Sequence, residues 1–458
     1  MTQTRYAAPS RPTRAVTGTG TASASPFAAS RALAARAHDL IPGGAHTYAK
    51  GDDQFPEDAP GFMARGKGCH AWDVDGNEFI EYGIGLRSVT LGHAYEPVVR
   101  AAAEAMQWGA NFTRPHKIEV EAAEAVLSLV GQDMVKFAKH GSDATTAAVK
   151  LSRAFTGRDM VAVCGDHPFF AVDDWFIGTT AMNAGIPAAT RALVVKFKYN
   201  DPVSLQALFD QYPNQIACVV MEAENGEAPL PGYLQQVHEA CKRNGALWVL
   251  DEIITGFRWH NGGAQAYHGV KPDLCSFGKG MANGFSVSAL CGRRDVMEQG
   301  GLRTDRKRVF TLSTTHGGET HALAACIATV NEYKRRDVIG DIWRAGQRLA
   351  DGVNRVVASL GVGEHFYLTN KPCALIYVTK DADGNRSQAF RTLFLQEMIK
   401  RGVVCPNLIV SAAHTDADVD RTVEAVGESL EVYKRALADG VERYLEGRPV
   451  KPVAREYN

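Results

Sequence analysis

Asp251 and Lys279 are the two residues whose surroundings best suit catalysis. Asp251 follows the apolar run 247–250, and Lys279 follows the run 273–277 with a glycine on each side. Buried strands of a parallel sheet end at one edge, so these runs would bring together an acid and an amine that are 28 residues apart. A lysine with open space around its nitrogen can form a Schiff base, and an adjacent acid can hold a pyridinium proton. The spacing alone leaves open a second interpretation, in which both groups are simply solvated.

Two turns that contain glycine precede helices and are candidate phosphate sites. Gly141 and Ser142 stand between a short strand and a helix that we expect to reach about residue 155, and residues 311–319 precede an alanine-rich helix. The free N–H groups and the positive dipole end of a helix N-terminus attract phosphate. On its own, such a turn is more often only a helix cap.

Two further polar groups follow predicted buried strands. The strand 160–164 leads into an aromatic loop that begins with His167, and the strand 216–221 ends at Glu222. An aromatic loop at this edge of a sheet can stack on a flat cofactor. The same loop is equally compatible with an ordinary core cluster.

Strands and helices alternate between residues 135 and 295, which predicts an α/β fold with a mainly parallel sheet covered on both faces. From about residue 335 the order becomes helix, strand, helix, strand, helix, which is typical of a compact α+β domain. A chain of 458 residues also exceeds what one core normally serves. We therefore predict four segments: a disordered tail (1–28), an N-terminal segment that contributes to the smaller domain and the active site (29–75), a large domain (76–330) and a C-terminal small domain (331–458).

The composition is that of an ordinary globular protein, with 45% hydrophobic and 22% charged residues. The net charge of −1 gives no electrostatic reason to expect binding to nucleic acid or to an anionic membrane. The nine cysteines are scattered without a CxxC pair, which favours reduced thiols in a cytoplasmic protein and predicts no metal site. No apolar run approaches the length of a membrane span.

Residues 1–28 contain no acidic residue and little apolar surface, and the first acid is Asp39. Such a segment cannot offset the entropy of ordering, so we predict disorder. An acid-poor start with arginine and serine also resembles a transit peptide, although no amphipathic stripe accompanies it.

Eight consecutive residues from Asp251, DEIITGFR, and the stretch from Pro272 to Lys279 together match two motifs of one enzyme family. The sequence resembles the fold-type I pyridoxal phosphate enzymes, specifically the class III aminotransferase family, and is most similar to its glutamate-1-semialdehyde aminomutase branch. The resemblance covers about residues 35–435. Further matching motifs begin at Ile41, Asp73, Leu91, Thr156 and Ala413.

The resemblance implies a role for each group around the cofactor ring. Lys279 would hold pyridoxal 5′-phosphate as an internal aldimine and then move a proton on the bound amine. Asp251 would pair with the pyridinium nitrogen and keep it protonated. Ile253 would pack on one face of the ring. His167, where the family usually has a tyrosine, would cover the other face.

The resemblance also implies how the phosphate is held. Gly141 and Ser142 match part of the family's phosphate motif, and Glu222 matches the acid of its Glu-Pro strand end. Thr315 would reach the phosphate from a neighbouring subunit, which implies an obligatory homodimer.

The chain departs from the aminomutase pattern where that enzyme reads its substrate. Lys50 stands near the place of an arginine that clamps a carboxylate, and lysine lacks the bidentate geometry of arginine. Arg87 replaces a small residue. With His46 and Asn111, these residues form the candidate substrate set, and they argue against the aminomutase reaction itself.

We therefore predict a pyridoxal phosphate-dependent aminotransferase that works by ping-pong half-reactions. Its partners would be small molecules, an amine donor such as glutamate and a carbonyl acceptor that is hydroxylated or sugar-like. Arg87 could equally read a carboxylate from a new direction. The alternatives are an intramolecular aminomutase, an epimerase, or a binding protein that has lost catalysis.

Overall fold

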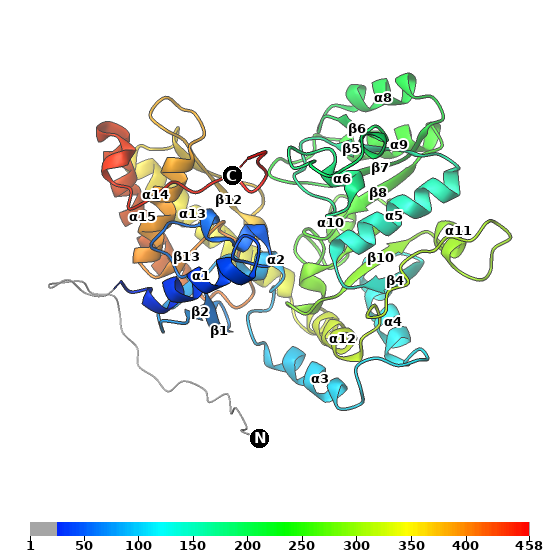
Figure 1. Cartoon of the computed structure of the whole chain (residues 1–458), viewed down its shortest axis with the longest axis horizontal. Helices are drawn as coiled ribbons and strands as arrows, with labels where there is room; N and C mark the ends of the chain where they lie inside the picture. Colours follow the sequence, from blue (N-terminus) through cyan, green and yellow to red (C-terminus); the bar gives the residue numbers. More distant parts are fainter. Residues whose placement is uncertain (1–24, 458) are drawn as a thin grey trace.

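The computed structural model describes residues 25–457 and arranges them in two lobes (Figure 1). The larger lobe is built on a seven-stranded sheet. The smaller lobe contains a four-stranded sheet, a hairpin and three long helices. Residues 1–24, and with them most of the predicted tail, lie outside the described residues.

The large sheet has the strand order β4-β10-β9-β8-β7-β5-β6. Neighbouring strands run parallel except β10, which is antiparallel to both β4 and β9. The predicted α/β fold with a mainly parallel sheet is confirmed. The strands are β4 (Met134–Ala138), β5 (Met160–Cys164), β6 (Val194–Phe197), β7 (Ile216–Glu222), β8 (Leu247–Asp251), β9 (Leu274–Phe277) and β10 (Ser288–Gly292).

Alternate residues of the central strands face two separate apolar cores. Val161 and Val163 lie in the core that includes the apolar face of α5, whereas Ala162 and Cys164 lie in the core that includes α9. This alternation follows from the pleat of a strand, and burial on both faces explains why the strands read as continuous apolar runs. The helices around the sheet are α4 (Ile118–Val130), α5 (Gly141–Thr156), α8 (Pro202–Gln211), α9 (Tyr233–Arg243) and α12 (Thr320–Arg335).

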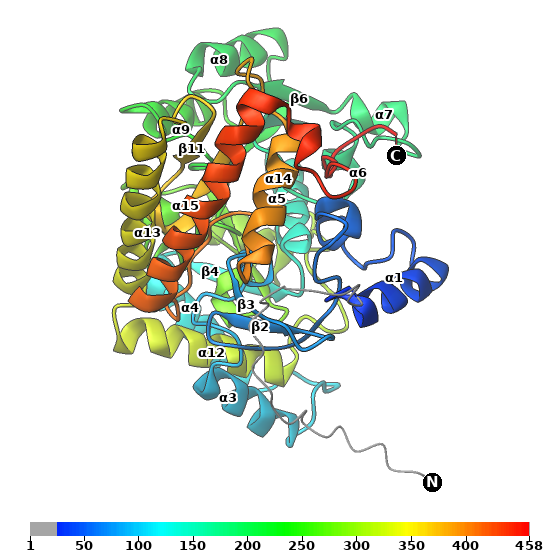
Figure 2. The same cartoon turned by 90° about the vertical axis from the view of Figure 1, so that its left-hand side faces the viewer.

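The smaller lobe joins segments from both ends of the chain (Figure 2). Strands β1 (Met63–Lys67), β2 (His70–Asp73) and β3 (Glu78–Glu81) are antiparallel, and β13 (Val403–Val404) pairs parallel with β3. The N-terminal part of the chain therefore shares a sheet with the C-terminal part, while division at residues 75 and 330 stays a prediction. The other elements of this lobe are α13 (Val338–Leu360), β11 (Phe366–Thr369), β12 (Ile376–Thr379), α14 (Gln388–Lys400) and α15 (Asp416–Asp439).

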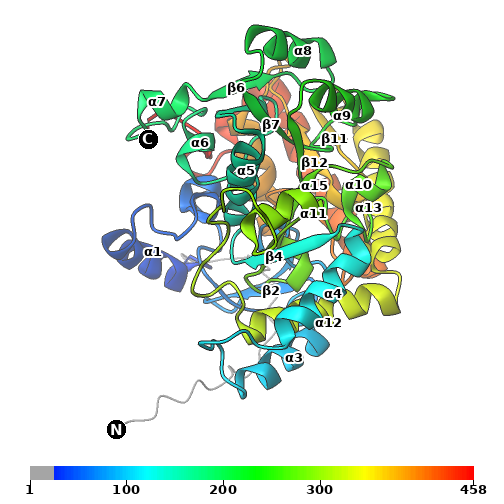
Figure 3. The same ribbon diagram turned by 90° about the vertical axis from the view of Figure 1, so that its right-hand side faces the viewer.

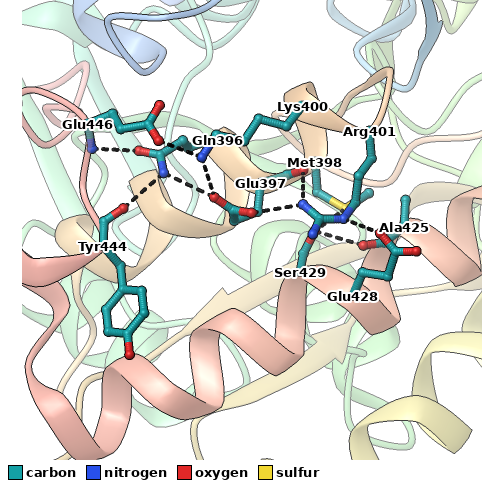
Figure 4. A network of polar contacts seen from close by, with 10 residues as sticks. All are labelled: Gln396, Glu397, Met398, Lys400, Arg401, Ala425, Glu428, Ser429, Tyr444 and Glu446. Carbon is teal, nitrogen blue, oxygen red and sulfur yellow. Dashed lines mark hydrogen bonds and ion pairs between the residues drawn. The ribbon is translucent and has the colours of Figure 1, made fainter. Parts of the chain in front are cut away.

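A row of charged residues fastens the end of α14 to α15 (Figure 4). Glu397 accepts hydrogen bonds from Lys400 and Arg401, each at 2.8 Å, and Arg401 also donates to Glu428 at 2.6 Å. Burial alone would raise the pKa of Glu397, but the hydrogen bonds from Lys400 and Arg401 hold it below its usual value. The carboxylate thus stays ionised and paired between the two helices.

Residues 25–28, the last four of the predicted tail, make contacts with the folded chain. Phe27 is buried and stacks on Phe79 with ring centroids 6.5 Å apart, and the Ser25 hydroxyl donates to Asp58 at 3.3 Å. The first helix, α1 (Ala28–Leu40), starts directly afterwards. One large apolar side chain thus anchors residues 25–28 to the smaller lobe, while the tail boundary at residue 28 stays a prediction.

Helix α3 (Glu96–Met106) packs against α12 beside the larger lobe (Figure 3). Between residues 25 and 457, no helix combines the length and the apolar character that crossing a bilayer requires. The short helices are η1 (Tyr48–Lys50), η2 (Asp52–Gln54), α2 (Ile84–Arg87), α6 (Asp174–Ile177), α7 (Ala188–Arg191), α10 (Gly263–Tyr267), η3 (Lys279–Ala282), α11 (Arg294–Met297), η4 (Glu298–Gly300), η5 (Pro372–Ala374) and η6 (Val441–Arg443).

Candidate active site

The carboxyl ends of β7, β8 and β9 place three polar side chains in one row. Glu222 is the register partner of Asp251, and Asp251 is the register partner of Ser276. The Ser276 hydroxyl and the Ile253 backbone N–H both donate to Asp251 Oδ1 at 2.9 Å. These bonds fix the carboxylate, and no group within residues 25–457 donates a hydrogen bond to its second oxygen. Asp251 therefore has one oxygen left for a ligand.

Burial sets the charge state of the two acids in this row. It raises the pKa of Asp251 to about 6, against hydrogen bonds from Ile253 and Ser276 and the positive charge of Lys279. Burial also raises the pKa of Glu222, and the neighbouring negative charge of Asp251 raises it further. Asp251 is therefore mostly ionised at neutral pH, whereas Glu222 is held towards its neutral form.

Lys279 follows β9 and opens η3 with a φ of +43°. This left-handed conformation is strained for a lysine and is typical of residues held for function. Burial lowers the pKa of Lys279 from 10.5 to about 8, and the positive charge of Arg87 lowers it as well, while Asp251 and Glu222 oppose both effects. A larger share of the amine is therefore neutral and nucleophilic near neutral pH.

We expect the amine of Lys279 to react through a pH midpoint near its lowered pKa of about 8. In the cofactor-free protein, the rate of reductive methylation at Lys279 should rise up to that pH and then level off, because only the neutral amine reacts. Mass spectrometry of the modified peptide, with exposed Lys271 as the reference, measures this profile. A profile for Lys279 that coincides with that of Lys271 would contradict the prediction.

A cavity of about 330 Å³ connects these groups to the N-terminus of α5. Lys279, Asp251 and Glu222 line it together with Gly141 and Ser142, as their positions at the sheet edge predict. The remaining lining residues are Ser88, Lys139, His140, Pro168, Phe169, Phe170, Ile253, Ile254, Gly284, Phe285, Ser286 and Val287.

Two glycines hold Ile253 in its place in this cavity. A Cβ atom on Gly141 would lie 3.0–3.2 Å from three side-chain carbons of Ile253, and one on Gly278 would lie 3.0 Å from its Cδ1. Ile253 is thus confined between the helix N-terminus and the strand that precedes Lys279. This confinement is compatible with its predicted role of packing on a cofactor ring.

Replacing Gly141 with valine should weaken cofactor binding by about tenfold or more. The added side chain must push Ile253 out of position, and overpacking of this kind costs about 1–3 kcal/mol. Absorbance titration with pyridoxal 5′-phosphate measures the effect. The control is Gly427→Ala in α15, where the new Cβ meets only ordinary contacts of 3.8 Å. Unchanged affinity in Gly141→Val would show that Ile253 has room to move.

His167 lies behind the cavity wall rather than among its lining residues. It is buried, and its Nδ1 accepts the backbone N–H of Glu222 at 3.1 Å. Burial lowers its pKa to about 4, so the ring is neutral at pH 7. The neighbouring residues Pro168, Phe169 and Phe170 line the cavity instead. The stacking role that the family resemblance implies for His167 stays a prediction.

The candidate substrate residues do not gather at the cavity. His46 and Lys50 are exposed near η1, and Asn111 donates to the backbone oxygen of Thr315 at 2.9 Å on an exposed loop. None of these three residues lines the cavity, and neither does the fourth candidate, Arg87. Only Arg87 acts on the site, through its charge on Lys279 and Glu222.

Two polar residues of the site were not predicted. The Ser276 hydroxyl fixes the carboxylate of Asp251. Ser276 is the one residue with a hydroxyl in its apolar run, and this could have indicated its role once the register of the two strands was known. Arg258 is 1% exposed and donates from Nη1 to the backbone oxygens of Cys373 and Val410, each at 2.9 Å. Its role depends on contacts between the lobes that local sequence does not show.

The adjacent acids Asp251 and Glu252 have different roles: Asp251 lines the cavity, and Glu252 holds the chain after β8 in place. The Glu252 carboxylate accepts the backbone N–H groups of Ala264 at 2.8 Å and Gln265 at 2.6 Å, and the hydroxyl of Thr255 also bonds to it. Glu252 therefore secures the segment that follows β8. Asp251 alone of the two lines the cavity.

Several groups in the cavity fit pyridoxal 5′-phosphate. Glu222 Oε2 and His167 Nε2 are buried without a hydrogen-bond partner among residues 25–457. Both hydrogen bonds to Asp251 go to Oδ1, which leaves Oδ2 for a ligand. The helix N-terminus at Gly141 suits a phosphate, and the Lys279 amine suits an aldehyde. Fold and cavity together are those of a fold-type I pyridoxal phosphate enzyme.

Within that class, the chain belongs to the class III aminotransferase family, whose sequence profile matches residues 54–364. It is 32% identical over 425 residues to a glutamate-1-semialdehyde 2,1-aminomutase of Anaeromyxobacter dehalogenans, covering 86% of this chain and 96% of the relative. It is also 32% identical to the enzyme of that name from Archaeoglobus fulgidus, covering 88% and 99%. The predicted family and branch are confirmed, as is the cofactor.

Solved structures of the same class share the fold. The pyridoxal phosphate internal aldimine form of the FumI protein of Sphingopyxis sp. MTA144 superposes with a TM-score of 0.82 at 27% identity, covering 90% of this chain and 97% of that one. A glutamate-1-semialdehyde aminomutase from Pseudomonas aeruginosa PAO1 gives a TM-score of 0.78 at 19% identity, covering 88% and 94%. The second likeness concerns the fold alone.

Proposed function

We propose that this protein is an aminotransferase that passes an amino group from an amine donor, glutamate by default, to a carbonyl acceptor in two half-reactions. The observation that carries the proposal is the pairing of Lys279, with its lowered pKa, and Asp251 in one cavity. Both partners are small molecules. We also propose a cytoplasmic homodimer in which Thr315 completes the phosphate site of the other subunit, because Thr315 is exposed and lies outside the cavity of its own chain.

When bound, pyridoxal 5′-phosphate supplies an aldehyde that takes up amino groups and a ring that withdraws electrons. The chain provides the remaining functions. Gly141 and Ser142 at the start of α5 would hold the phosphate, and Asp251 would keep a proton on the ring nitrogen through its free oxygen. Lys279 would take the proton from the carbon that bears the amino group and return it to the carbon on the other side of the amino nitrogen.

An intramolecular aminomutase is the second candidate, because the relatives that are 32% identical over most of the chain carry that name. Two observations favour transfer between separate molecules. Lys50 stands near the place of the arginine in the aminomutase pattern, and it is exposed and does not line the cavity. A substrate bound through that arginine would therefore lose its clamp.

Release of the donor's keto acid separates the two candidates. The protein is loaded with cofactor and mixed with L-glutamate and a panel of carbonyl acceptors, and 2-oxoglutarate is measured. Transfer predicts one 2-oxoglutarate for each amine formed. Complete turnover of glutamate-1-semialdehyde without free keto acid would establish the aminomutase instead.

A further inference from the structure

Three side chains of different chemistry meet in the smaller lobe, outside the cavity that contains Lys279. Cys69 directly precedes β2, His70 is its first residue, and Asp418 lies in the first turn of α15. One sulfur, one ring nitrogen and one carboxylate oxygen of these side chains all lie within 4.8 Å of one another. Between residues 25 and 457, no other three histidine, cysteine or acidic side chains come together in this way.

The contacts among the three groups are already close to the spacing of metal ligands. The Cys69 thiol donates to Asp418 Oδ2 at 3.3 Å, and His70 Nε2 lies 3.1 Å from Asp418 Oδ1. A tetrahedral zinc ion, with bonds of about 2.3 Å to sulfur and about 2.0 Å to nitrogen or oxygen, holds its ligand atoms about 3.3–3.5 Å apart. Small movements of the side chains therefore suffice to surround an ion.

The helix cap of α15 fixes the carboxylate of Asp418. Its Oδ2 accepts the backbone N–H of Thr415 at 2.9 Å and the Thr415 hydroxyl at 2.6 Å. Its Oδ1 faces His70 Nε2 and takes part in no other hydrogen bond among residues 25–457. The cap thus holds one carboxylate oxygen in a fixed direction, as a preorganised metal ligand requires.

His70 lies between two carboxylates. Its Nε2 faces Asp418, and its Nδ1 lies 3.0 Å from Glu78 Oε1 without the geometry of a hydrogen bond. A neutral imidazole carries one N–H, so one of its nitrogens must turn a lone pair towards a negative oxygen. A cation on Nε2 removes this repulsion and leaves the proton of Nδ1 facing Glu78. Histidine ligands of metal ions are commonly supported by an outer carboxylate in this way.

We propose that Cys69, His70 and Asp418 bind one zinc ion through Sγ, Nε2 and Oδ1, with a water molecule as the fourth ligand. Zinc accepts this mixture of sulfur, nitrogen and oxygen. As the Zn–S bond forms, the S–H bond breaks and its proton leaves to solvent, so no oxidant or reductant takes part. The side chains of His70 and Asp418 are 28% and 15% exposed, which gives the ion and the water access.

The zinc ion ties the two ends of the chain together within the smaller lobe. Cys69 and His70 belong to the N-terminal part of the lobe, and Asp418 follows them by 349 and 348 residues. This separation explains why the spacing of cysteines predicted no metal site. An ion that binds only the folded chain stabilises it by mass action, so this site serves the lobe and is independent of the reaction at Lys279.

The test measures zinc in the full-length protein loaded with its cofactor. Elemental mass spectrometry after gel filtration counts the bound metal, and competition with a chromophoric chelator measures the affinity. We expect one zinc ion per chain, and binding weaker by about 100-fold or more in Cys69→Ala and Asp418→Asn, since even outer partners of metal ligands contribute about 10- to 100-fold. Glu78→Gln should weaken binding by about tenfold. The control is Cys405→Ala, which removes another buried thiol of the same lobe and should leave the affinity unchanged.

Cobalt binding to the wild-type protein tests the site without depending on any variant. Co²⁺ should produce the charge-transfer band of a thiolate–cobalt bond in a difference spectrum against the cobalt-free protein, and Zn²⁺ should abolish it. Absence of bound zinc after gel filtration would overturn the proposal and assign the three groups to a hydrogen-bonded network with a protonated His70. Bound cobalt without the band, or equal zinc affinity in wild type and Cys69→Ala, would overturn it as well.

Discussion

Lys279→Ala is expected to reduce turnover by about 10⁴-fold or more. The amine of Lys279 is the one base in the cavity whose lowered pKa suits proton transfer near neutral pH, and a positioned acid–base group contributes about 10²- to 10⁴-fold. The loss should exceed that range because the same amine also holds the cofactor covalently. Steady-state kinetics with L-glutamate and the best acceptor measures the change.

The control for Lys279→Ala is Lys271→Ala, which removes an exposed lysine of the same segment. Wild type and Lys271→Ala should both yield a borohydride-stable cofactor adduct by mass spectrometry, and Lys279→Ala should yield none. Added methylamine should restore part of the activity of Lys279→Ala, because a small amine can occupy the vacated space. An adduct at another lysine with undiminished turnover would refute the assignment.

Asp251→Asn is expected to reduce kcat by about 10²- to 10³-fold while the protein still binds its cofactor. Asparagine keeps the shape but cannot hold a proton on the ring nitrogen by charge, and one such preorganised contact contributes about that factor. Ser276→Ala should have a smaller effect of about fivefold, because it removes only the 2.9 Å bond that orients the carboxylate. Equal kcat in wild type and Asp251→Asn would remove Asp251 from the mechanism.

Asp251→Asn lowers kcat but should raise the stability of the cofactor-free protein above pH 6. Because burial raises the pKa of Asp251 to about 6, the folded state retains a proton that the unfolded state has lost, and stability falls as pH rises towards 6. Above that pH the ionised group is a fixed cost, which Asp251→Asn removes. The free energy of unfolding of the variant should therefore exceed that of wild type at pH 8, and the difference should vanish near pH 4. Urea unfolding at both pH values measures this.

The sequence allowed the reactive pair and the sheet to be predicted because both depend on local pattern. Apolar runs that end in Asp251 and Lys279 are strands whatever surrounds them, and parallel strands place their ends together. The antiparallel strand β10 and the neighbouring position of Ser276 depend on strand order, which no local pattern specifies.

Other parts of the site depend on how loops pack after the strands have formed. The Nδ1 of His167 accepts the N–H of Glu222 from a strand 55 residues later, and its role at a cofactor face stays a prediction. Asn111 contacts the loop of Thr315 rather than the cavity, a pairing across 204 residues. Contacts of this range follow from tertiary packing, so the residue types alone could not reveal them.

Arg258 connects the smaller lobe to the chain beside the cavity that contains Lys279. Its guanidinium bonds to backbone oxygens of Cys373 and Val410 in the smaller lobe and of Arg87 beside the cavity. The position of the smaller lobe thus bears on where Arg258 and the backbone of Arg87 lie. Because the positive charges of both residues lower the pKa of Lys279, the share of neutral amine at the active site depends on how the two lobes are held together.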